Sequence, residues 1–172
     1  MFVFKLIVSI AIVLTTGYIG MMKAKRLKTR EYVLREMVTF LNLVRNDIRY
    51  MLSILPNAYE VARQKLSTPL KIAIGQIVED MLVTNSEILV NKSIVDNISS
   101  ISSLTEYDKN IFISTLKNLG RSDLESQINI IENGITIIEN QISEANEVKL
   151  ANSKLYKTIG VISGLMIVVI FI

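Results

Sequence analysis

The chain has 172 residues, of which half are apolar and 20% are charged, and its formal net charge is +3. It contains neither cysteine nor histidine, which excludes disulfides, thiol catalysis, the commonest metal ligand and the commonest general base. Its two prolines and seven glycines leave long uninterrupted stretches, so the composition favours helices over a many-stranded sheet.

The first expected element is a transmembrane helix over residues 1–22. Leu6 to Met22 is a run of 17 uncharged residues, close to the roughly 20 that a spanning helix needs. Lys5 extends the run if its ammonium reaches the interface. A cleaved signal peptide, which is the alternative, would show a small-residue cleavage site before a neutral stretch. Here a basic segment follows at once, so we expect an uncleaved anchor.

Residues 23–30 form a basic juxtamembrane segment, and further lysines precede the last apolar run. The cations are Lys23, Lys25, Arg26, Lys28 and Arg30, followed much later by Lys149, Lys154 and Lys157. Residues 31–148 instead carry 16 acids and 10 bases, so the body offers no basic face to nucleic acid. The positive-inside rule then predicts a cytoplasmic helical bundle over residues 31–157, with both termini across the bilayer.

From Leu34 onward, apolar residues recur at steps of three and four, as on one face of a helix. They are Leu34, Val38, Leu41, Ile48, Leu52 and Leu55, with Arg45 at the one polar position of the stripe. Such a stripe buries one helix face against another helix. Pro56 and Asn57 should end this stretch and open a second helix from Ala58 to Leu66.

Shorter helices are expected in the middle of the chain. Thr68 followed by Pro69 has the pattern of an N-cap with proline at the first helical position, and it predicts a helix to about Thr84. A weaker helical pattern, with β-branched and serine residues, runs over residues 88–101.

The last two expected helices begin with capping boxes. Thr105 and Asp108 have that spacing, and Gly120 lies where a left-handed residue would end the helix. Ser122 and Glu125 repeat the spacing before a long last helix. Its apolar stripe is Leu124, Ile128, Ile131, Ile135, Ile138, Ile142 and Ala145. The whole predicts an all-α fold: a cytoplasmic bundle of about six helices with long, antiparallel first and last helices, flanked by N- and C-terminal transmembrane helices.

The C-terminal transmembrane helix is expected over residues 158–172. Ile159 to Ile172 is a run of 14 apolar residues. A buried core helix is the alternative, but such a helix would show one polar face. Small residues let helix backbones approach closely in lipid. Four small residues are therefore candidate packing positions between the membrane helices, and the alternative is that small residues occur at this spacing by chance. They are Gly20, Ala24, Gly160 and Gly164.

The sequence shows no catalytic constellation. Glu79 and Asp80 are neighbours on a predicted helix and point about 100° apart, which favours a solvated face over a shared proton. Asp123 and Glu125 would stand at a helix N-terminus, where negative charge suits the helix dipole. We therefore expect no enzymatic activity, cofactor, metal or small-molecule substrate.

Three groups of residues together carry a family resemblance. The first two are Gly20, Ala24, Arg30 and Leu34, and then Asp47, Ile48 and Tyr50. The third and most specific is Leu119-Gly120-x-x-Asp123-x-x-x-Gln127, followed by a long amphipathic helix, lysines and a short apolar tail. In this combination the chain resembles, over essentially its full length, the stage III sporulation protein AB family of endospore-forming bacteria. It departs where the family has Thr-Pro-Leu soon after the tyrosine, because here Pro56 comes six residues later.

The resemblance implies a non-enzymatic component of the mother-cell channel complex that connects to the forespore. The family's cytoplasmic domain is similar to the helical domains of type II secretion inner-membrane platform proteins. The implied partners are the membrane, a cytoplasmic secretion-type ATPase and other sporulation channel proteins. Assembly into a homo-oligomer is a further open alternative. The candidate partner-binding residues are Gly120, Asp123 and Gln127, with a purely structural helix cap as the alternative.

Two other interpretations compete with the platform or adaptor. A signalling protein with paired membrane helices would need a substantial extracytoplasmic sensing region, and the predicted topology leaves only a few residues outside. A small pore would need polar residues along the spans, and Thr15 and Thr16 are too few. The alternative that stays open is a membrane-anchored helical signalling or scaffold protein unrelated to secretion.

Overall fold

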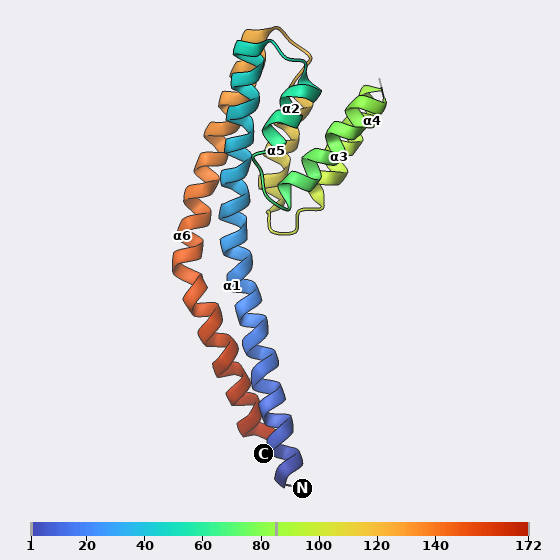
Figure 1. Ribbon diagram of the computed structural model, residues 1–172. Helices are drawn as coiled ribbons and strands as arrows, with labels where there is room; N and C mark the ends of the chain where they lie inside the picture. Colours follow the sequence, from blue (N-terminus) through green and yellow to red (C-terminus); the bar gives the residue numbers. More distant parts are fainter. Residues whose placement is uncertain (1, 85, 172) are drawn as a thin grey trace. The chain divides into compact units, whose positions relative to one another are not determined.

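The computed structural model describes residues 2–84 and 86–171, and the side chains of all of these except 2–7, 157, 161, 170 and 171. The described chain is all-helical (Figure 1). Its elements are α1 (Phe2–Asn46), a π-helix (Asp47–Met51), α2 (Leu55–Arg63), α3 (Leu70–Val83), α4 (Glu87–Ser99), α5 (Glu106–Asn118) and α6 (Leu124–Phe171). The expected all-α fold with long first and last helices is confirmed. The two end segments are continuous with α1 and α6 rather than separate helices.

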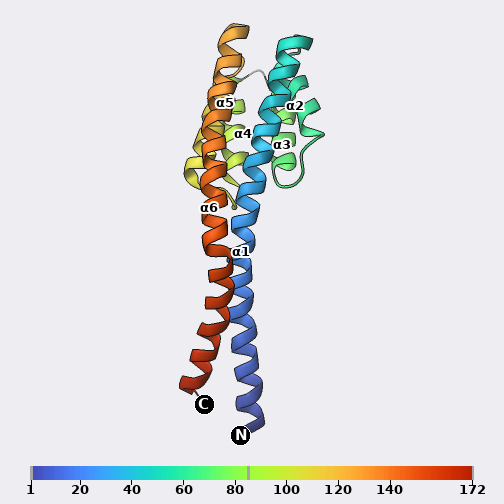
Figure 2. The same ribbon diagram turned by 90° about the vertical axis from the view of Figure 1, so that its left-hand side faces the viewer.

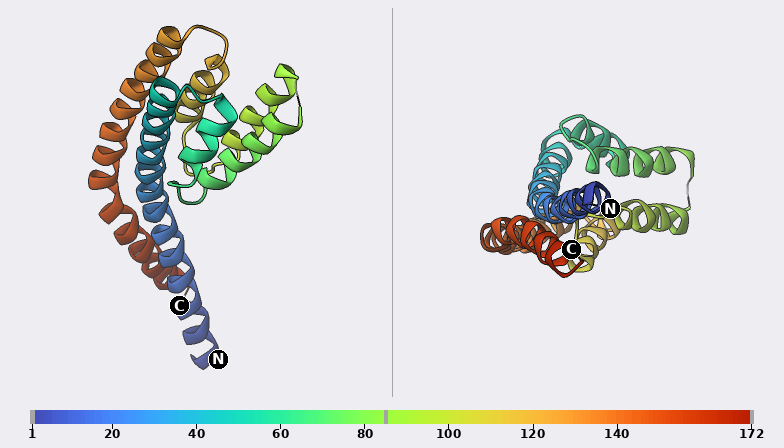
Figure 3. Two further views of the ribbon diagram at one scale, coloured as in Figure 1. Left: turned by 45° about the horizontal axis from the view of Figure 1, so that its top comes forward. Right: turned by 90° about the horizontal axis from the view of Figure 1, so that it is seen from below.

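The chain divides into two compact units. Met1–Glu31 with Glu144–Ile172 form one, here called the end unit, and Tyr32–Ser143 form the other, here called the bundle unit. In the bundle unit, α1, α3 and α5 finish at the same end at which α2, α4 and α6 begin (Figures 1 and 3). We call this the turn end of the bundle unit.

The predicted apolar stripes supply the core of the bundle unit. Leu34, Leu41 and Ile48 of the first stripe are buried, as are Ile131 and Ile138 of the last. Aromatic rings fill the space between these helices and the shorter ones. Phe40 meets Tyr59 and Phe112 edge-on, with ring centroids 5.1 Å and 5.9 Å apart. The 3.6-residue period therefore identified the inward face of both long helices.

The stripe prediction is wrong at Leu52. The chain leaves α-helical winding at Asp47 and continues as a π-helix to Met51, and a π turn holds more residues than an α turn. Leu52 then takes a left-handed conformation, with φ 52° and ψ 31°, and its side chain is 75% exposed. A leucine in this conformation costs about 1–2 kcal/mol.

α2 begins at Leu55, three residues before the predicted start at Ala58. The carbonyl oxygen of Ile54 accepts the backbone N–H of Ala58 at 3.1 Å, which is the first bond of the helix. Pro56 therefore lies inside the first turn, where a missing N–H has no intrahelical partner to lose. The proline opens α2 rather than separating it from the preceding stretch.

The predicted N-cap of α3 lies one residue before the observed one, and the predicted N-cap of α5 is confirmed. Pro69 rather than Thr68 caps α3, because the carbonyl oxygen of Pro69 accepts the N–H of Ala73 at 3.3 Å. The capping box of α5 has both of its bonds. The N–H of Asp108 donates to Thr105 Oγ1 at 3.2 Å, and the N–H of Thr105 donates to Asp108 Oδ2 at 2.9 Å.

Candidate functional site

The three candidate partner-binding residues lie together in the turn between α5 and α6. Gly120 has a φ of +82°, the left-handed conformation expected for the residue that ends α5. Its N–H donates to Gln127 Oε1 at 3.1 Å, while Gln127 Nε2 donates to the carbonyl oxygen of Ser122 at 2.8 Å. The Gln127 amide thus closes the turn by bonding the backbone at two points.

Asp123 is the N-cap of α6. Its Oδ1 accepts the N–H of Ser126 at 2.7 Å, and its carbonyl oxygen accepts the N–H of Gln127 at 3.0 Å. The predicted capping box at Ser122 is therefore wrong by one residue. Hydrogen bonds from the backbone and then the side chain of Ser126 hold the pKa of the Asp123 carboxyl below its ordinary value.

Acidification is expected to loosen the first turn of α6. Because the folded pKa of Asp123 lies below the unfolded one, the stabilisation is present above the unfolded pKa and is lost as pH falls through the folded pKa. An NMR titration should find the Asp123 carboxyl more acidic than an ordinary aspartate, and Ser126→Ala should raise its pKa by removing one donor. An ordinary pKa in the native chain would contradict the cap.

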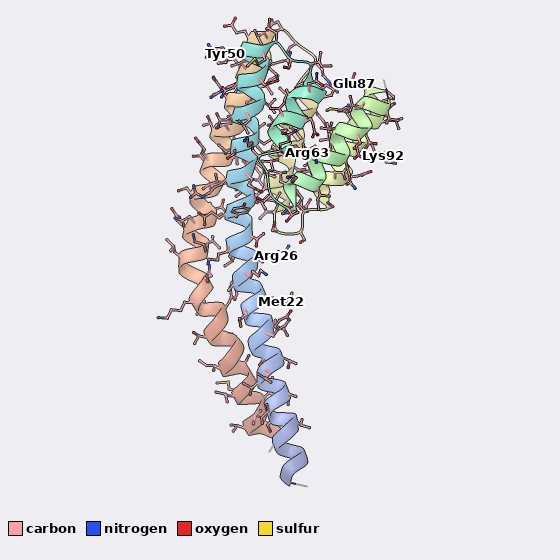
Figure 4. All side chains as sticks on the ribbon, viewed as in Figure 1. Met22, Arg26, Tyr50, Arg63, Glu87 and Lys92 are labelled. Atoms are coloured by element: carbon pink, nitrogen blue, oxygen red, sulfur yellow. The ribbon has the colours of Figure 1, made fainter. Side chains whose placement is uncertain are left out.

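Contacts tie this turn to two other elements of the bundle unit. A Cβ on Gly120 would lie 2.7 Å from Leu55 Cδ1, so the turn packs on the start of α2. Arg121 forms an ion pair with Glu87 in the first turn of α4. The beginnings of α2, α4 and α6 are therefore connected at the turn end, where Figure 4 marks Tyr50 and Glu87.

Gly120→Ala is expected to destabilise the bundle unit by about 2 kcal/mol, because alanine is strained at positive φ and its methyl group would press on Leu55. Adding Leu55→Ala should relieve the contact but leave the backbone strain. Thermal unfolding of both variants measures the two contributions. If Gly120→Ala leaves the melting temperature unchanged but the cells no longer sporulate, Gly120 belongs to a partner surface. If the melting temperature falls and sporulation is lost as well, Gly120 acts as the helix cap.

The predicted basic residues are mostly exposed. On α1 these are Lys23, Lys25, Arg26 and Lys28, and on α6 Lys154. Figure 4 marks Arg26 on α1. The Lys23 ammonium lies 5.9 Å from the centre of the Tyr156 ring, within the range of a cation–π interaction. The side chain of Lys157 lies outside the described residues.

Arg30 departs from this pattern. Its side chain is only 9% exposed, and its Nη1 lies 3.5 Å from Glu144 Oε1. One residue on, Glu31 Oε2 lies 2.5 Å from Lys149 Nζ. Within the end unit these two pairs join α1 to α6, so Arg30 is a buried ion-pair residue rather than an exposed rim cation.

The small residues of the end unit lie where α1 and α6 run side by side (Figures 1 and 2). A Cβ on Gly20 would lie 3.2 Å from the Cα of Gly160 and 2.5 Å from the carbonyl oxygen of Tyr156. A Cβ on Gly164 would meet Thr16 on α1, and Ala24 is 2% exposed. The two backbones approach too closely here for larger side chains.

Among the residues that the structure describes, no helix combines the length and the apolar character that crossing a membrane requires. Within the same residues, no three aspartate, glutamate, histidine or cysteine side chains are grouped so that they could hold a metal ion.

Sequence reasoning missed a set of exposed apolar side chains at the turn end. Tyr50, Met51 and Leu52 are 73%, 73% and 75% exposed, and Val83 and Ile88 are 87% and 80% exposed. The signal was present in the first group, because three consecutive apolar residues cannot all lie on one helix face. The second group carries the same signal, because Val83 ends the apolar run 81–83 and Ile88 opens the apolar run 88–90.

The geometry defines an all-helical protein whose candidate site is a hydrogen-bonded surface turn. A model of the stage III sporulation protein AB family matches residues 5–172, so the chain belongs to that family and has a sporulation-related role. The resemblance inferred from the motifs is confirmed. Comparisons with curated proteins and with solved structures found no match.

Proposed function

We propose that this chain is a non-enzymatic platform subunit of the secretion-like channel complex between mother cell and forespore. In this role it docks a cytoplasmic secretion-type ATPase and other membrane subunits of the channel. The observation that carries the proposal is the family match, which covers both apolar ends as well as the bundle unit.

The proposal places the chain in the cell membrane as a multi-pass protein, with the bundle unit in the mother-cell cytoplasm. The uncharged run from Leu6 to Met22 and the apolar tail from Ile159 support two spans. Exposed lysines and arginines after the first run favour the cytoplasmic side for the bundle unit. The close approach of α1 and α6 at Gly20 and Gly160 suits two helices paired in lipid.

A cross-linked pull-down from the membranes of sporulating cells tests the partners. We expect a tagged copy of this chain to recover the secretion-type ATPase and other channel subunits, and a tagged unrelated membrane protein to recover neither. Absence of the ATPase and of the channel subunits from the tagged sample would defeat the platform proposal.

A reporter fused after Ile172 tests the topology separately. A reporter that is active only outside the cytoplasm should give signal there, while the same reporter inserted after Arg63, in the bundle unit, should give none. A silent fusion after Ile172 together with signal from the insertion after Arg63 would overturn the predicted orientation.

A further inference from the structure

The most exposed large apolar side chains of the bundle unit lie at its turn end. They are Tyr50, Met51, Leu52, Val83 and Ile88, with exposed fractions from 73% to 87%, followed by Leu82 and Ile54 at 67% and 65%. We call these seven residues the apolar tip. On the other faces of the bundle unit, exposed apolar residues such as Val61 and Ile72 are only 54% and 57% exposed.

Two groups make up the apolar tip, and the site turn connects them. Tyr50 to Ile54 leads into Leu55, which contacts Gly120, and Arg121 is paired with Glu87 beside Ile88. Clustered exposed apolar side chains mark protein interaction sites, and both groups present large apolar residues that are 65% to 87% exposed.

The backbone beneath the first group is held in a costly form. The π-helix ends at Met51 and Leu52 follows in the left-handed region, and both features are frequent at functional sites. The π-helix places Ile48 in the core, while its last residues and the left-handed Leu52 leave Tyr50, Met51 and Leu52 exposed together.

The charges at the turn end favour a protein partner over a lipid surface. Exposed acids (Glu87, Asp123 and Glu125) outnumber exposed bases (Arg49 and Arg121), and an anionic leaflet attracts the opposite balance. Arg121 is already paired with Glu87, and Arg49 lies 5.9 Å from the Tyr50 ring centre. A complementary surface would thus be apolar at its centre with lysine or arginine at its border.

We infer that the apolar tip is the face with which this protein docks a folded cytoplasmic partner, one that presents an apolar patch bordered by basic residues. The inference rests on the proposed platform function and deepens it, since it assigns the docking to the turn end. Gly120, Asp123 and Gln127 are then positioning residues that hold the turn beneath this face, while Leu55 connects the turn to α2 and Arg121 connects it to α4.

Binding of the purified secretion-type ATPase to the full chain in lipid nanodiscs tests the inference. The first variant is Leu52→Asn with Ile54→Ser, and asparagine also suits the left-handed conformation at position 52. The second is Val83→Ser with Ile88→Ser. The matched control is Val61→Ser with Ile72→Ser, which removes exposed apolar side chains elsewhere on the bundle unit.

We expect each tip variant to weaken ATPase binding at least tenfold and the control to change it less than threefold. Hydrogen exchange of the bundle unit should remain as in the native chain for Val83→Ser with Ile88→Ser, and should be as slow or slower for Leu52→Asn with Ile54→Ser, because asparagine relieves strain at position 52. Native-like binding by both tip variants would overturn the inference and leave the platform function intact. A change in the oligomeric state of the tip variants without a change in ATPase binding would identify a second copy as the occupant instead. Failure of the native chain to bind the ATPase would overturn both.

Discussion

Phe40→Ala is expected to lower the free energy of unfolding of the bundle unit by about 3–5 kcal/mol. Phe40 is fully buried, and its ring contacts Tyr59 and Phe112 at interplanar angles of 74° and 68°. The truncation removes buried apolar surface, leaves a cavity and abolishes two edge-to-face contacts worth roughly 0.5–1.5 kcal/mol each. Small domains are stable by only about 5–15 kcal/mol, so the loss is a large share of the total.

Hydrogen exchange of peptides from residues 32–143 measures this loss in the bundle unit alone. Tyr59→Phe is the matched control, because it keeps the ring that Phe40 contacts. The Tyr59 hydroxyl is buried without a hydrogen-bond partner among the described residues, and burial raises its pKa. Its removal should therefore change the unfolding free energy by less than about 1 kcal/mol. If Tyr59→Phe were as damaging as Phe40→Ala, the hydroxyl would have a partner and this account of the cluster would be wrong.

Hydrophobic periodicity predicted the core positions of the long helices because it depends only on helical geometry. Leu34, Leu41 and Ile138 are buried for that reason. The same counting failed at Leu52, since a π turn breaks the 3.6-residue period. Nothing local in the sequence marks that break, because tertiary packing determines where a helix changes its winding.

In the candidate site, too, some roles follow from local sequence and others only from the folded structure. Gly120 was predictable, because a glycine after an amphipathic stretch is the usual left-handed end of a helix. The role of Gln127 was not predictable from the sequence. Its side-chain amide accepts the N–H of Gly120, seven residues earlier, and this bond can form only when the turn is closed. Counting charges likewise placed Arg30 in the basic rim, whereas the folded chain buries its side chain and pairs it with Glu144, which is distant in the sequence.

The pairing of the two ends also needed the structure. Small residues at four-residue spacing occur at Gly20 and Ala24 and again at Gly160 and Gly164, but spacing alone does not say which helix each pair faces. The structure puts Gly20 against Gly160 and Gly164 against Thr16, on the contact between α1 and α6, and it buries Ala24. These glycines therefore act in the end unit as the sites of closest backbone approach.

Gly160→Leu is expected to force α1 and α6 apart in the end unit. Even a Cβ at this position would lie 2.8 Å from the carbonyl oxygen of Thr16 and 3.2 Å from the Cα of Gly20. Overpacking by side chains costs about 1–3 kcal/mol, and here the obstacle is backbone, which yields less readily than a flexible side chain. Side-chain size sets the separation of packed helices over a range of about 2 Å, so an increase of at least that size should follow.

Spin labels on Tyr18→Cys and Ile159→Cys can report the separation by electron paramagnetic resonance, because the chain has no cysteine of its own and both positions are exposed. The labelled chain with Gly160→Leu should show a longer and broader distance distribution than the labelled chain without it. Thr158→Leu adds comparable bulk to an exposed position of α6 and should leave the distribution unchanged. Equal distributions for Gly160→Leu and Thr158→Leu would show that the helices do not meet at Gly160. A shift confined to Gly160→Leu, together with loss of sporulation, would make the paired ends a working part of this protein rather than a simple tether.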